Sequence, residues 1–485
     1  MKKLNEREAA LQILTRIREE EIFSHIAVRE MLDRLEREGM DRRQRAFVKR
    51  LTEGVIERRI ELSDIIRRHV KKGTRIRPVI RDILQMGIFQ ILYMDAVPDS
   101  AACNEAVKLT KEYGKKELSG FVNGVLRTVV REKEKGEYGA GSAAAEGPDP
   151  EDRAGADSAP VRAGETHGQE SISALSRKYS MPEWIVRMWT EQMGGEETRK
   201  LLAALLEIRP VSIRFDDRVS EAAVTETIEQ MKARGVRVTR GQYLPRCFYL
   251  TGTDSLTTLP GYREGLWTVQ DESSMMAAEA AGLSGGETVY DVCAAPGGKS
   301  MHCASKLMKL GGGTVHSFDL SRNKVAQIVK NANRMHLDNI TIMQRDALAP
   351  VPEEEKGTAD VLLCDLPCSG LGVIGRKRDI KYHITKAQLE ELAALQKKIL
   401  KNAVSYLKEG GTLIYSTCTI NRGENEEVAD FIGKETELRP DPLPPHLPEG
   451  IAGISGPDGS RLQLLPHVHG TDGFFVARFK KIKEA

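Results

Sequence analysis

The second half of the chain alternates short apolar runs with helical patterns, which restricts the folds it can adopt. From about Gln270, strand-like runs occupy residues 288–292, 314–318, 339–343, 359–364, 412–415 and 474–479. Between the fourth and fifth runs, Thr385 and Gln388 form the capping-box pattern of a helix, and we expect Gly410-Gly411 to close that helix. Strands separated by helices predict an open, mostly parallel, doubly wound α/β sheet over residues 270–485. Its ligand is expected at the carboxyl ends of the strands.

The first part of the chain carries only helical periodicity. Ala10, Ile13 and Ile17 keep the spacing of one helical face, and Pro78 can open a helix that buries Ile80 and its neighbours. This predicts an all-α domain over residues 1–135. Residues 136–170, rich in Gly, Ala, Pro and acids, predict a flexible linker. Residues 171–269 mix helical and alternating patterns and predict a small α+β region.

Composition limits the cell compartment and the partners. The 485 residues include 72 basic and 70 acidic side chains, but the basic ones concentrate before residue 135, which favours a polyanionic partner. Seven cysteines, an odd number without regular spacing, argue for reduced thiols rather than disulfides or a metal site. No apolar run is long enough to span a membrane, so we expect a cytoplasmic protein.

A turn of small residues follows the first strand. Cys293, Ala294, Ala295, Pro296, Gly297, Gly298 and Lys299 lie between Asp291 and Ser300, and small residues there let the backbone approach a ligand closely. A nucleotide P-loop would need glycine where Cys293 stands, and the dinucleotide fingerprint is absent. Asp319 ends the next strand, where an acid can bind the hydroxyls of a ribose, and Asp346 follows the third, where it can accept from an adenine amino group. This pattern predicts a site for S-adenosylmethionine.

Two cysteines follow the fourth and fifth strands. If those strands are neighbours, Cys368 and Cys418 lie together at the edge that holds the cofactor. A thiolate can add to C6 of a pyrimidine and turn C5 into a nucleophile for a methyl group. Asp365 is placed to hydrogen-bond the base at N3 or at its exocyclic amine. Nearby cations that can activate a thiol are Lys299, Arg376, Lys377, Arg378 and Lys381, and candidate phosphate contacts are Arg209, Arg214, Arg237, Arg240 and Arg246.

These motifs resemble those of the Nol1/Nop2/Sun family of RNA cytosine-C5 methyltransferases, in particular its RsmB-type members. The match covers Asp291 to Ser300, Asp365 to Gly370, Ser416 to Thr419 and Gly470 to Phe475. The helical front domain is similar to a NusB-like RNA-binding domain, and the insert from Ser173 is similar to the small RNA-recognition-like region of the family. A departure is Arg378, which stands where relatives often have proline.

The resemblance implies a Rossmann-like methyltransferase domain that methylates 16S ribosomal RNA with S-adenosylmethionine, and we expect a monomer. It assigns catalysis to Cys418 as nucleophile and Cys368 in product release, with Asp365 and Lys299. Cofactor binding is assigned to the turn from Cys293 to Lys299, with Asp319, Asp346 and Asp365.

Two alternatives share much of this pattern. A transfer-RNA cytosine-C5 methyltransferase would use every catalytic residue named, and only the appended helical domain argues against it. A non-catalytic RNA-binding assembly or antitermination factor would use the helical domain alone. The presence of the acids and both thiols disfavours such a scaffold, since it needs none of them.

Overall fold

The structure is a computed structural model that describes residues 4–138, 170–253 and 255–482. The chain divides into two compact units. The first, here called the helical unit, comprises Met1–Ile208 together with the excursion Ile374–His383. The second, the sheet unit, comprises Arg209–Val373 and Ile384–Ala485. The predicted linker falls almost wholly outside the described residues, and the predicted domain boundaries stay predictions.

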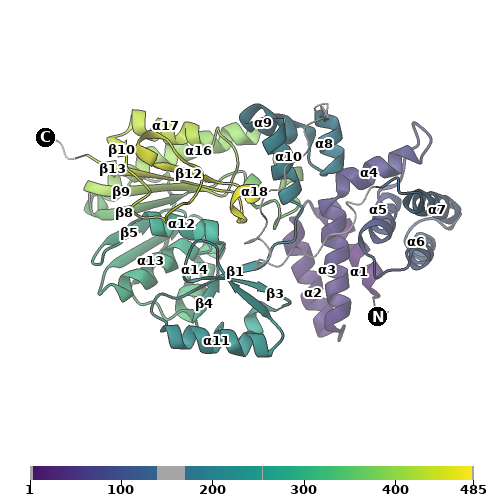
Figure 1. Cartoon of the computed structure of the whole chain (residues 1–485), viewed down its shortest axis with the longest axis horizontal. Helices are drawn as coiled ribbons and strands as arrows, with labels where there is room; N and C mark the ends of the chain where they lie inside the picture. Colours follow the sequence, from purple (N-terminus) through teal and green to yellow (C-terminus); the bar gives the residue numbers. More distant parts are fainter. Residues whose placement is uncertain (1–3, 139–169, 254, 483–485) are drawn as a thin grey trace, which may run out of the picture. The chain divides into compact units, whose positions relative to one another are not determined.

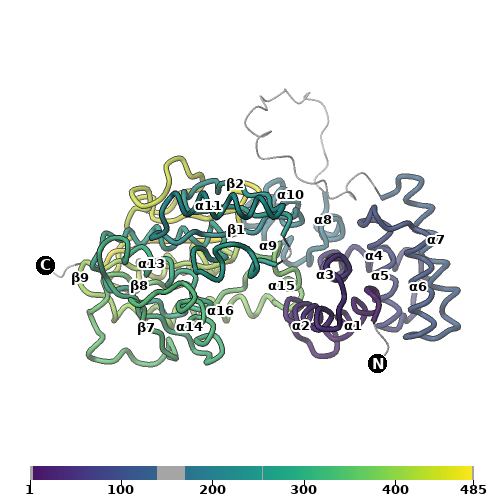
Figure 2. The backbone as a smooth tube through the Cα atoms, turned by 90° about the horizontal axis from the view of Figure 1, so that it is seen from below, coloured from purple at the N-terminus to yellow at the C-terminus, as the bar shows by residue number. Residues whose placement is uncertain are grey.

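The helical unit is built from helices throughout its described residues (Figure 1). They are α1 (Glu6–Glu20), α2 (Ser24–Arg37), α3 (Arg42–Glu57), α4 (Arg59–Arg68), α5 (Pro78–Tyr93), α6 (Asp99–Tyr113), α7 (Ser119–Glu134), α8 (Ile172–Lys178), α9 (Glu183–Met193) and α10 (Gly195–Ala204). Pro78 opens α5 as predicted, and Ile80, Leu84 and Ile88 are buried. Helices α5, α6 and α7 lie side by side (Figure 2). A Cβ on Gly87 would lie 2.8 Å from Leu126, so glycine permits the close approach of α5 and α7.

The excursion is anchored by charge. Arg378 donates to Glu53 and to Glu57 of α3, each at 2.8 Å. Lys381, on the short helix α15 (Ile380–His383), is buried and donates to the Glu57 carbonyl at 2.9 Å. The chain thus leaves the sheet unit shortly after Cys368, is held by α3, and returns at Ile384. The position where this sequence departs from the family pattern therefore forms ion pairs within the helical unit.

The sheet unit begins with a small antiparallel sheet in the order β2-β3-β1-β4. Its elements are β1 (Val211–Phe215), α11 (Glu221–Ala233), β2 (Arg237–Arg240), β3 (Cys247–Thr251) and β4 (Trp267–Val269). The predicted alternation holds, since Ile213 and Phe215 of β1 are buried with Trp267. Arg214 faces the other way and donates to Gln270 at 3.0 Å and to Asp217 at 3.2 Å.

The large sheet has the order β11-β12-β13-β9-β8-β5-β6-β7, with β10 paired to β13. Its strands are β5 (Thr288–Asp291), β6 (Thr314–Asp319), β7 (Ile340–Gln344), β8 (Ala359–Asp365), β9 (Leu407–Thr417), β10 (Leu438–Pro440), β11 (Ile454–Ser455), β12 (Arg461–Leu464) and β13 (Phe474–Lys481). The strands from β9 to β7 run parallel, as predicted. The antiparallel extension by β10, β11 and β12 was not predicted, because these strands are short.

Helices cover both faces of the large sheet (Figure 1). Val361 and Leu363 of β8 pack in one core with α12 (Glu272–Ala280) and α13 (Gly298–Lys309), whereas Leu362 and Cys364 pack in a second core with α16 (Lys386–Ala403) and α17 (Glu426–Glu435). The remaining helices are α14 (Arg322–Arg334) and α18 (Pro466–His469). This alternation makes β8 buried on both sides, as expected of a central parallel strand.

One local prediction is wrong. The capping box at Thr385 does start α16, but the helix ends at Ala403 rather than at Gly410-Gly411. Both glycines lie within β9, and a Cβ on Gly411 would lie 2.8 Å from the Lys408 carbonyl oxygen. The glycine pair therefore permits tight backbone packing near the start of the strand instead of capping a helix. Among the described residues, every helix is too short or too polar to cross a lipid bilayer.

Candidate active site

The site lies at the carboxyl ends of the parallel strands in the sheet unit. The strand register places Asp291 of β5 beside Ser317 of β6 and beside Leu363 of β8, and Asp365 of β8 beside Ser416 of β9. All these strands run in the same direction, so their ends meet at one edge. This is where a doubly wound sheet binds its ligand.

The turn after β5 is shaped by glycine and by hydrogen bonds. Gly297 has φ of 100°, a conformation that side-chain-bearing residues rarely adopt, and a Cβ there would lie 3.0 Å from Ile328. The Ala294 amide donates to the Phe318 carbonyl at 2.8 Å, and the Ala295 amide donates to the Asp319 carboxylate at 3.3 Å. The turn is therefore fastened to the end of β6, and α13 begins at Gly298.

The three acids that follow β5, β6 and β7 differ in exposure. Asp291 is fully buried and accepts from the Ser300 hydroxyl at 2.6 Å; burial, with the nearby charge of Asp365, raises the pKa of Asp291 to about 7. Asp319 is 5% exposed and faces the turn, and Asp346 is exposed, with one carboxylate oxygen bonded to the Leu348 amide. Asp291 thus supports the turn from beneath, whereas Asp319 lies beside it.

Lys299 joins the turn to the end of β8. Its ammonium group donates to Asp365 at 2.7 Å and to Ser274 at 2.9 Å, and it lies 5.1 Å from the centre of the Phe474 ring. Burial alone would lower the pKa of Lys299, but the charges of Asp365 and Asp291, with a contribution from Cys418, raise it. The other oxygen of Asp365 accepts from Ser416 at 2.8 Å. Lys299 is therefore held as a cation at the strand ends.

The two predicted thiols meet. The sulfur atoms of Cys368 and Cys418 are 3.4 Å apart, within hydrogen-bonding distance for sulfur, and both side chains are partly exposed. The hydrogen bond to Cys418 raises the pKa of Cys368 well above its usual range, and burial adds to this shift. The remaining described cysteines are free thiols as well. The two sulfur atoms thus share one hydrogen bond, in which either thiol can be the donor.

A buried carboxylate that the sequence analysis missed holds the two thiol loops together. Glu424 is fully buried and accepts from the Ser369 amide at 2.8 Å and from the Ser369 hydroxyl at 2.5 Å. It also accepts from Asn421 at 2.9 Å and from Gln396 at 3.3 Å. Ser369 follows Cys368, and its hydroxyl also lies 2.7 Å from the Thr419 hydroxyl, next to Cys418. A polar residue at position 396, on the apolar face of α16, was the sequence signal for this network.

Two glycines bring the thiol loops into backbone contact. The Gly372 amide donates to the Cys418 carbonyl at 3.1 Å, and the Gly473 amide donates to the Gly372 carbonyl at 2.9 Å. A Cβ on Gly372 would lie 2.0 Å from the Gly473 oxygen. No side chain fits at this point, so residues from three separate chain segments meet through their backbones.

Several predicted cationic contacts are corrected by the structure. Arg214 is 1% exposed and Arg209 donates to the Thr471 carbonyl, while Arg246 pairs with Glu221. Arg214 in particular is buried against Ser305 of α13 at 3.3 Å and is not available to a phosphate. Arg378 and Lys381 have their partners in the helical unit, so neither is a partner of the thiols. Lys299, another of the five proposed thiol-activating cations, is bonded within the site, to Asp365 at 2.7 Å.

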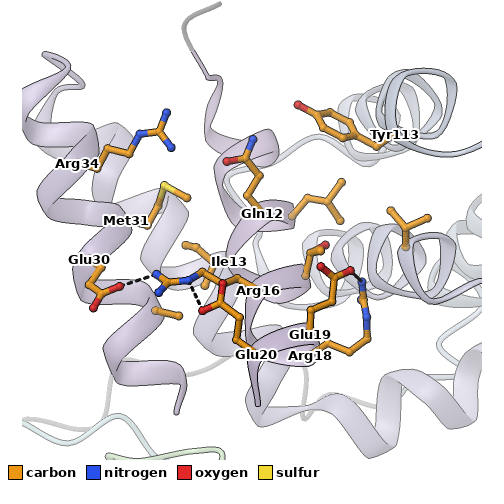
Figure 3. Close-up of a pocket in the computed structure, with 14 residues that line it drawn as sticks. Gln12, Ile13, Arg16, Arg18, Glu19, Glu20, Glu30, Met31, Arg34 and Tyr113 are labelled. Carbon is orange, nitrogen blue, oxygen red and sulfur yellow. Dashed lines mark hydrogen bonds and ion pairs between the residues drawn. The ribbon is translucent and has the colours of Figure 1, made fainter. Parts of the chain in front are cut away.

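A groove of about 680 Å³ in the helical unit is a separate feature (Figure 3). Its charged side chains neutralise one another, since Arg16 contacts Glu20 at 2.8 Å and Glu30 at 2.5 Å. The rest of its lining includes Ile13 and Met31 and contains no thiol. It lacks the groups that methyl-transfer chemistry needs.

Three segments of the chain match known families. Residues 280–480 match the 16S rRNA methyltransferase RsmB/F family, residues 4–131 match the NusB family, and residues 181–257 match the ferredoxin-like domain of RsmF/B-like methyltransferases. The probable ribosomal RNA small subunit methyltransferase B of Bacillus subtilis is 35% identical over 484 residues, which cover 99% of this chain and 100% of the relative. The protein of the same name from Synechocystis is 32% identical over 485 residues, with the same coverage.

Solved structures share the fold. The crystal structure of PH0851 matches 99% of this chain and 100% of its own, with a TM-score of 0.75 and 22% identity. NSun6 from Pyrococcus horikoshii, solved with SFG, matches 62% of this chain and 99% of its own, with a TM-score of 0.55 and 23% identity.

Along the chain, a NusB-type helical domain and a ferredoxin-like domain precede the mixed sheet that carries the turn and the thiol pair. This combination defines a multidomain RNA methyltransferase. More particularly, the chain belongs to the RsmB/F family of 16S rRNA methyltransferases, as its identity to full-length relatives shows.

Proposed function

We propose that the protein transfers a methyl group from S-adenosylmethionine to C5 of a cytosine in 16S ribosomal RNA through a covalent bond between Cys418 and C6. The observation that carries this proposal is the 3.4 Å separation of the Cys368 and Cys418 sulfur atoms beside Lys299 and Asp365. Methylation at a nitrogen or an oxygen does not need a thiol, because those atoms already hold a lone pair. C5 of a cytosine holds no such lone pair, and the addition of a thiolate to C6 is what makes C5 nucleophilic.

The residues at the edge of β5 and β6 fit the cofactor. Gly297 allows the tight turn after β5 through its positive φ, and Asp319, at the end of β6, offers carboxylate oxygens to ribose hydroxyls. The turn from Cys293 to Lys299 would hold the methionine part, with Asp346 near the adenine and Asp365 beside the donor. When bound, S-adenosylmethionine supplies an electrophilic methyl group attached to a positively charged sulfur.

The hydrogen bond between the thiols supports Cys418 as the nucleophile. Because the pKa of Cys368 is raised well above its usual range, Cys368 keeps its proton and donates it toward the Cys418 sulfur. An S–H donor and the Lys299 cation both stabilise negative charge on Cys418. Cys368 is then the residue beside the adduct that assists its breakdown.

The steps follow from these positions. The Cys418 sulfur bonds to C6, and the C5–C6 electron pair moves toward N3 and the carbonyl of the base. Asp365, fixed by Lys299 and Ser416, is placed to hydrogen-bond the base edge as this charge develops. C5 then takes the methyl group, the proton on C5 passes to water at this partly exposed edge, and the C5–C6 double bond forms again as the bond from sulfur to C6 breaks. The products are 5-methylcytosine and the demethylated cofactor, with the Cys418 thiolate restored.

The target base must leave its stack to reach a site at the end of the strands. For enzymes that act on a base, the free-energy cost of unstacking is lowest where the base is already unpaired. Flexible or partly assembled ribosomal RNA is therefore the expected substrate.

Trapping with thiol variants tests the proposal. Cys418→Ala should abolish methyl transfer and form no covalent RNA adduct. Cys368→Ala should retain the attack but accumulate the adduct, seen as a slow-migrating band on a denaturing gel. Cys103→Ala, a thiol of α6 in the helical unit, serves as the control and should behave as the parent protein.

Bisulfite mapping of ribosomal RNA from a strain without the protein identifies the product. One cytosine of 16S rRNA should lose its resistance to conversion. An adduct that survives Cys418→Ala, or lost resistance in transfer RNA instead of 16S rRNA, contradicts the proposal.

A further inference from the structure

An exposed aromatic cluster lies in the helical unit, where the excursion meets α2. Phe23, directly before α2, keeps 43% of its surface exposed. Its ring centre is 4.9 Å from that of His383 and 5.8 Å from that of His25. Both histidines are exposed as well. A large apolar ring at the surface, flanked by two more rings, offers a flat face to a ligand.

Exposed cations border these rings. Arg29 lies one helical turn beyond His25, and Lys377 lies in the excursion. Burial lowers the pKa of His25, the charges of Lys377 and Arg29 lower it further, and the charge of Asp379 opposes them. Among the described residues, neither Arg29 nor Lys377 forms a side-chain hydrogen bond or ion pair.

One acid beside the rings, Asp379, is already engaged. Asp379 is buried, accepts from the Ser24 amide at 2.5 Å, and lies 3.6 Å from the His383 ring nitrogen. It therefore closes the start of α2 and does not neutralise Arg29 or Lys377 by direct contact. The exposed surface of the cluster keeps its positive charge.

We propose that Phe23, with His25 and His383, is a stacking platform for an unpaired base of RNA, and that Arg29 and Lys377 bind the phosphates beside that base. Aromatic faces with neighbouring cations are the combination by which proteins hold single-stranded RNA. A protein partner would need a wider apolar surface, and the rings are bordered by charge instead. The inference rests on the proposed function only in taking RNA as the ligand.

The platform combines two segments of the helical unit that are far apart in the sequence. Phe23, His25 and Arg29 come from the start of the helical unit, whereas Lys377 and His383 follow Cys368 by nine and fifteen residues. A base stacked on Phe23 would thus be held partly by the segment that continues directly from the Cys368 loop.

Binding of a fluorescent single-stranded RNA by the full chain tests the platform. The assay uses fluorescence anisotropy without S-adenosylmethionine, so it does not depend on methyl transfer. Phe23→Ala should weaken binding about 5- to 150-fold, the range for loss of one base–aromatic stack. Phe23→Trp should restore binding, since it preserves a flat ring. Lys377→Ala should reduce the slope of log affinity against log salt by about 0.7, the value for one phosphate contact on a single strand.

Tyr113→Ala is the matched control, because Tyr113 is also an exposed aromatic side chain of the helical unit, at 37%. It should leave binding unchanged. Binding by Phe23→Ala within twofold of the parent protein would overturn the inference, and so would an equal loss in Phe23→Trp, which would indicate packing rather than stacking. Binding that depends on Phe23 in a protein that methylates no ribosomal RNA would sink the proposed function and leave the platform standing.

Discussion

Glu424→Gln separates the positioning of the thiols from the chemistry they perform. The substitution keeps the size and shape of the side chain but replaces one acceptor oxygen with an NH₂ group. Glu424 receives four donors, two on each oxygen. The NH₂ group can replace the oxygen that accepts from the Ser369 hydroxyl and from Asn421. The Ser369 hydroxyl can then rotate and accept a hydrogen bond from the NH₂ group, so Asn421 is the one donor that loses its partner. The opposite orientation costs more, because it leaves both the Ser369 amide and Gln396 unsatisfied.

The magnitude follows from that count. One buried donor left without an acceptor costs about 1–3 kcal/mol. If the loops relieve this cost by moving apart, the thiol pair is misplaced, and the same free energy appears as a fall in kcat of about 5- to 150-fold. Binding of S-adenosylmethionine should not change, since the hydrogen bonds of Glu424 go to the thiol loops and to α16 rather than to the turn after β5.

Radiolabelled methyl transfer to 16S rRNA under saturating cofactor measures kcat, and calorimetry measures the cofactor Kd. Glu427→Gln is the control, because Glu427 carries the same chemical group on an exposed part of α17. Turnover of Glu424→Gln within twofold of the parent protein would refute the reasoning. A loss of cofactor affinity as large as the loss of turnover would refute it too, since the defect would then lie in the whole edge of the sheet.

Two further predictions concern stability. Gly372→Ala should lower the melting temperature and abolish adduct formation, because its Cβ would lie 2.0 Å from the backbone oxygen of Gly473. Gly433→Ala on α17 is the control and should be neutral or stabilising, because a Cβ there meets nothing within 4 Å. Equal melting temperatures of the two variants would contradict this prediction. Asp291 has a pKa raised to about 7, against about 3.9 in an unfolded chain, so the native state holds an extra proton between these values and loses stability as pH rises from about 4 to 7. Asp291→Asn removes this loss. Urea unfolding should therefore show the free energy of unfolding of the parent protein falling relative to that of the variant between about pH 4 and 7, by up to about 4 kcal/mol. Parallel plots of that free energy against pH for the two proteins would count against the prediction.

Local patterns in the sequence were enough to determine the order of the secondary structure. Alternation of apolar residues depends only on neighbours along the chain, so β5, β6, β7, β8 and β13 were predicted to within a residue or two. The sequence analysis expected Cys368 and Cys418 to meet on the condition that β8 and β9 are neighbours, and the parallel pairing of these strands fulfils that condition. Short antiparallel strands such as β11, with two residues, carry too little pattern to be found this way.

Tertiary structure alone decided what surrounds the predicted residues. Two of the partners of Glu424, Ser369 and Gln396, lie on segments that no local pattern connects to it, and the buried state of Arg214 depends on packing against α13. The departure of residues 374–383 into the helical unit depends on Glu53 and Glu57, more than 300 residues away in the sequence. The chemical identity of each residue and the order of the elements along the chain depend on the local sequence. Burial, charge pairing and the pKa values that follow from them arise only when distant segments pack together and exclude water.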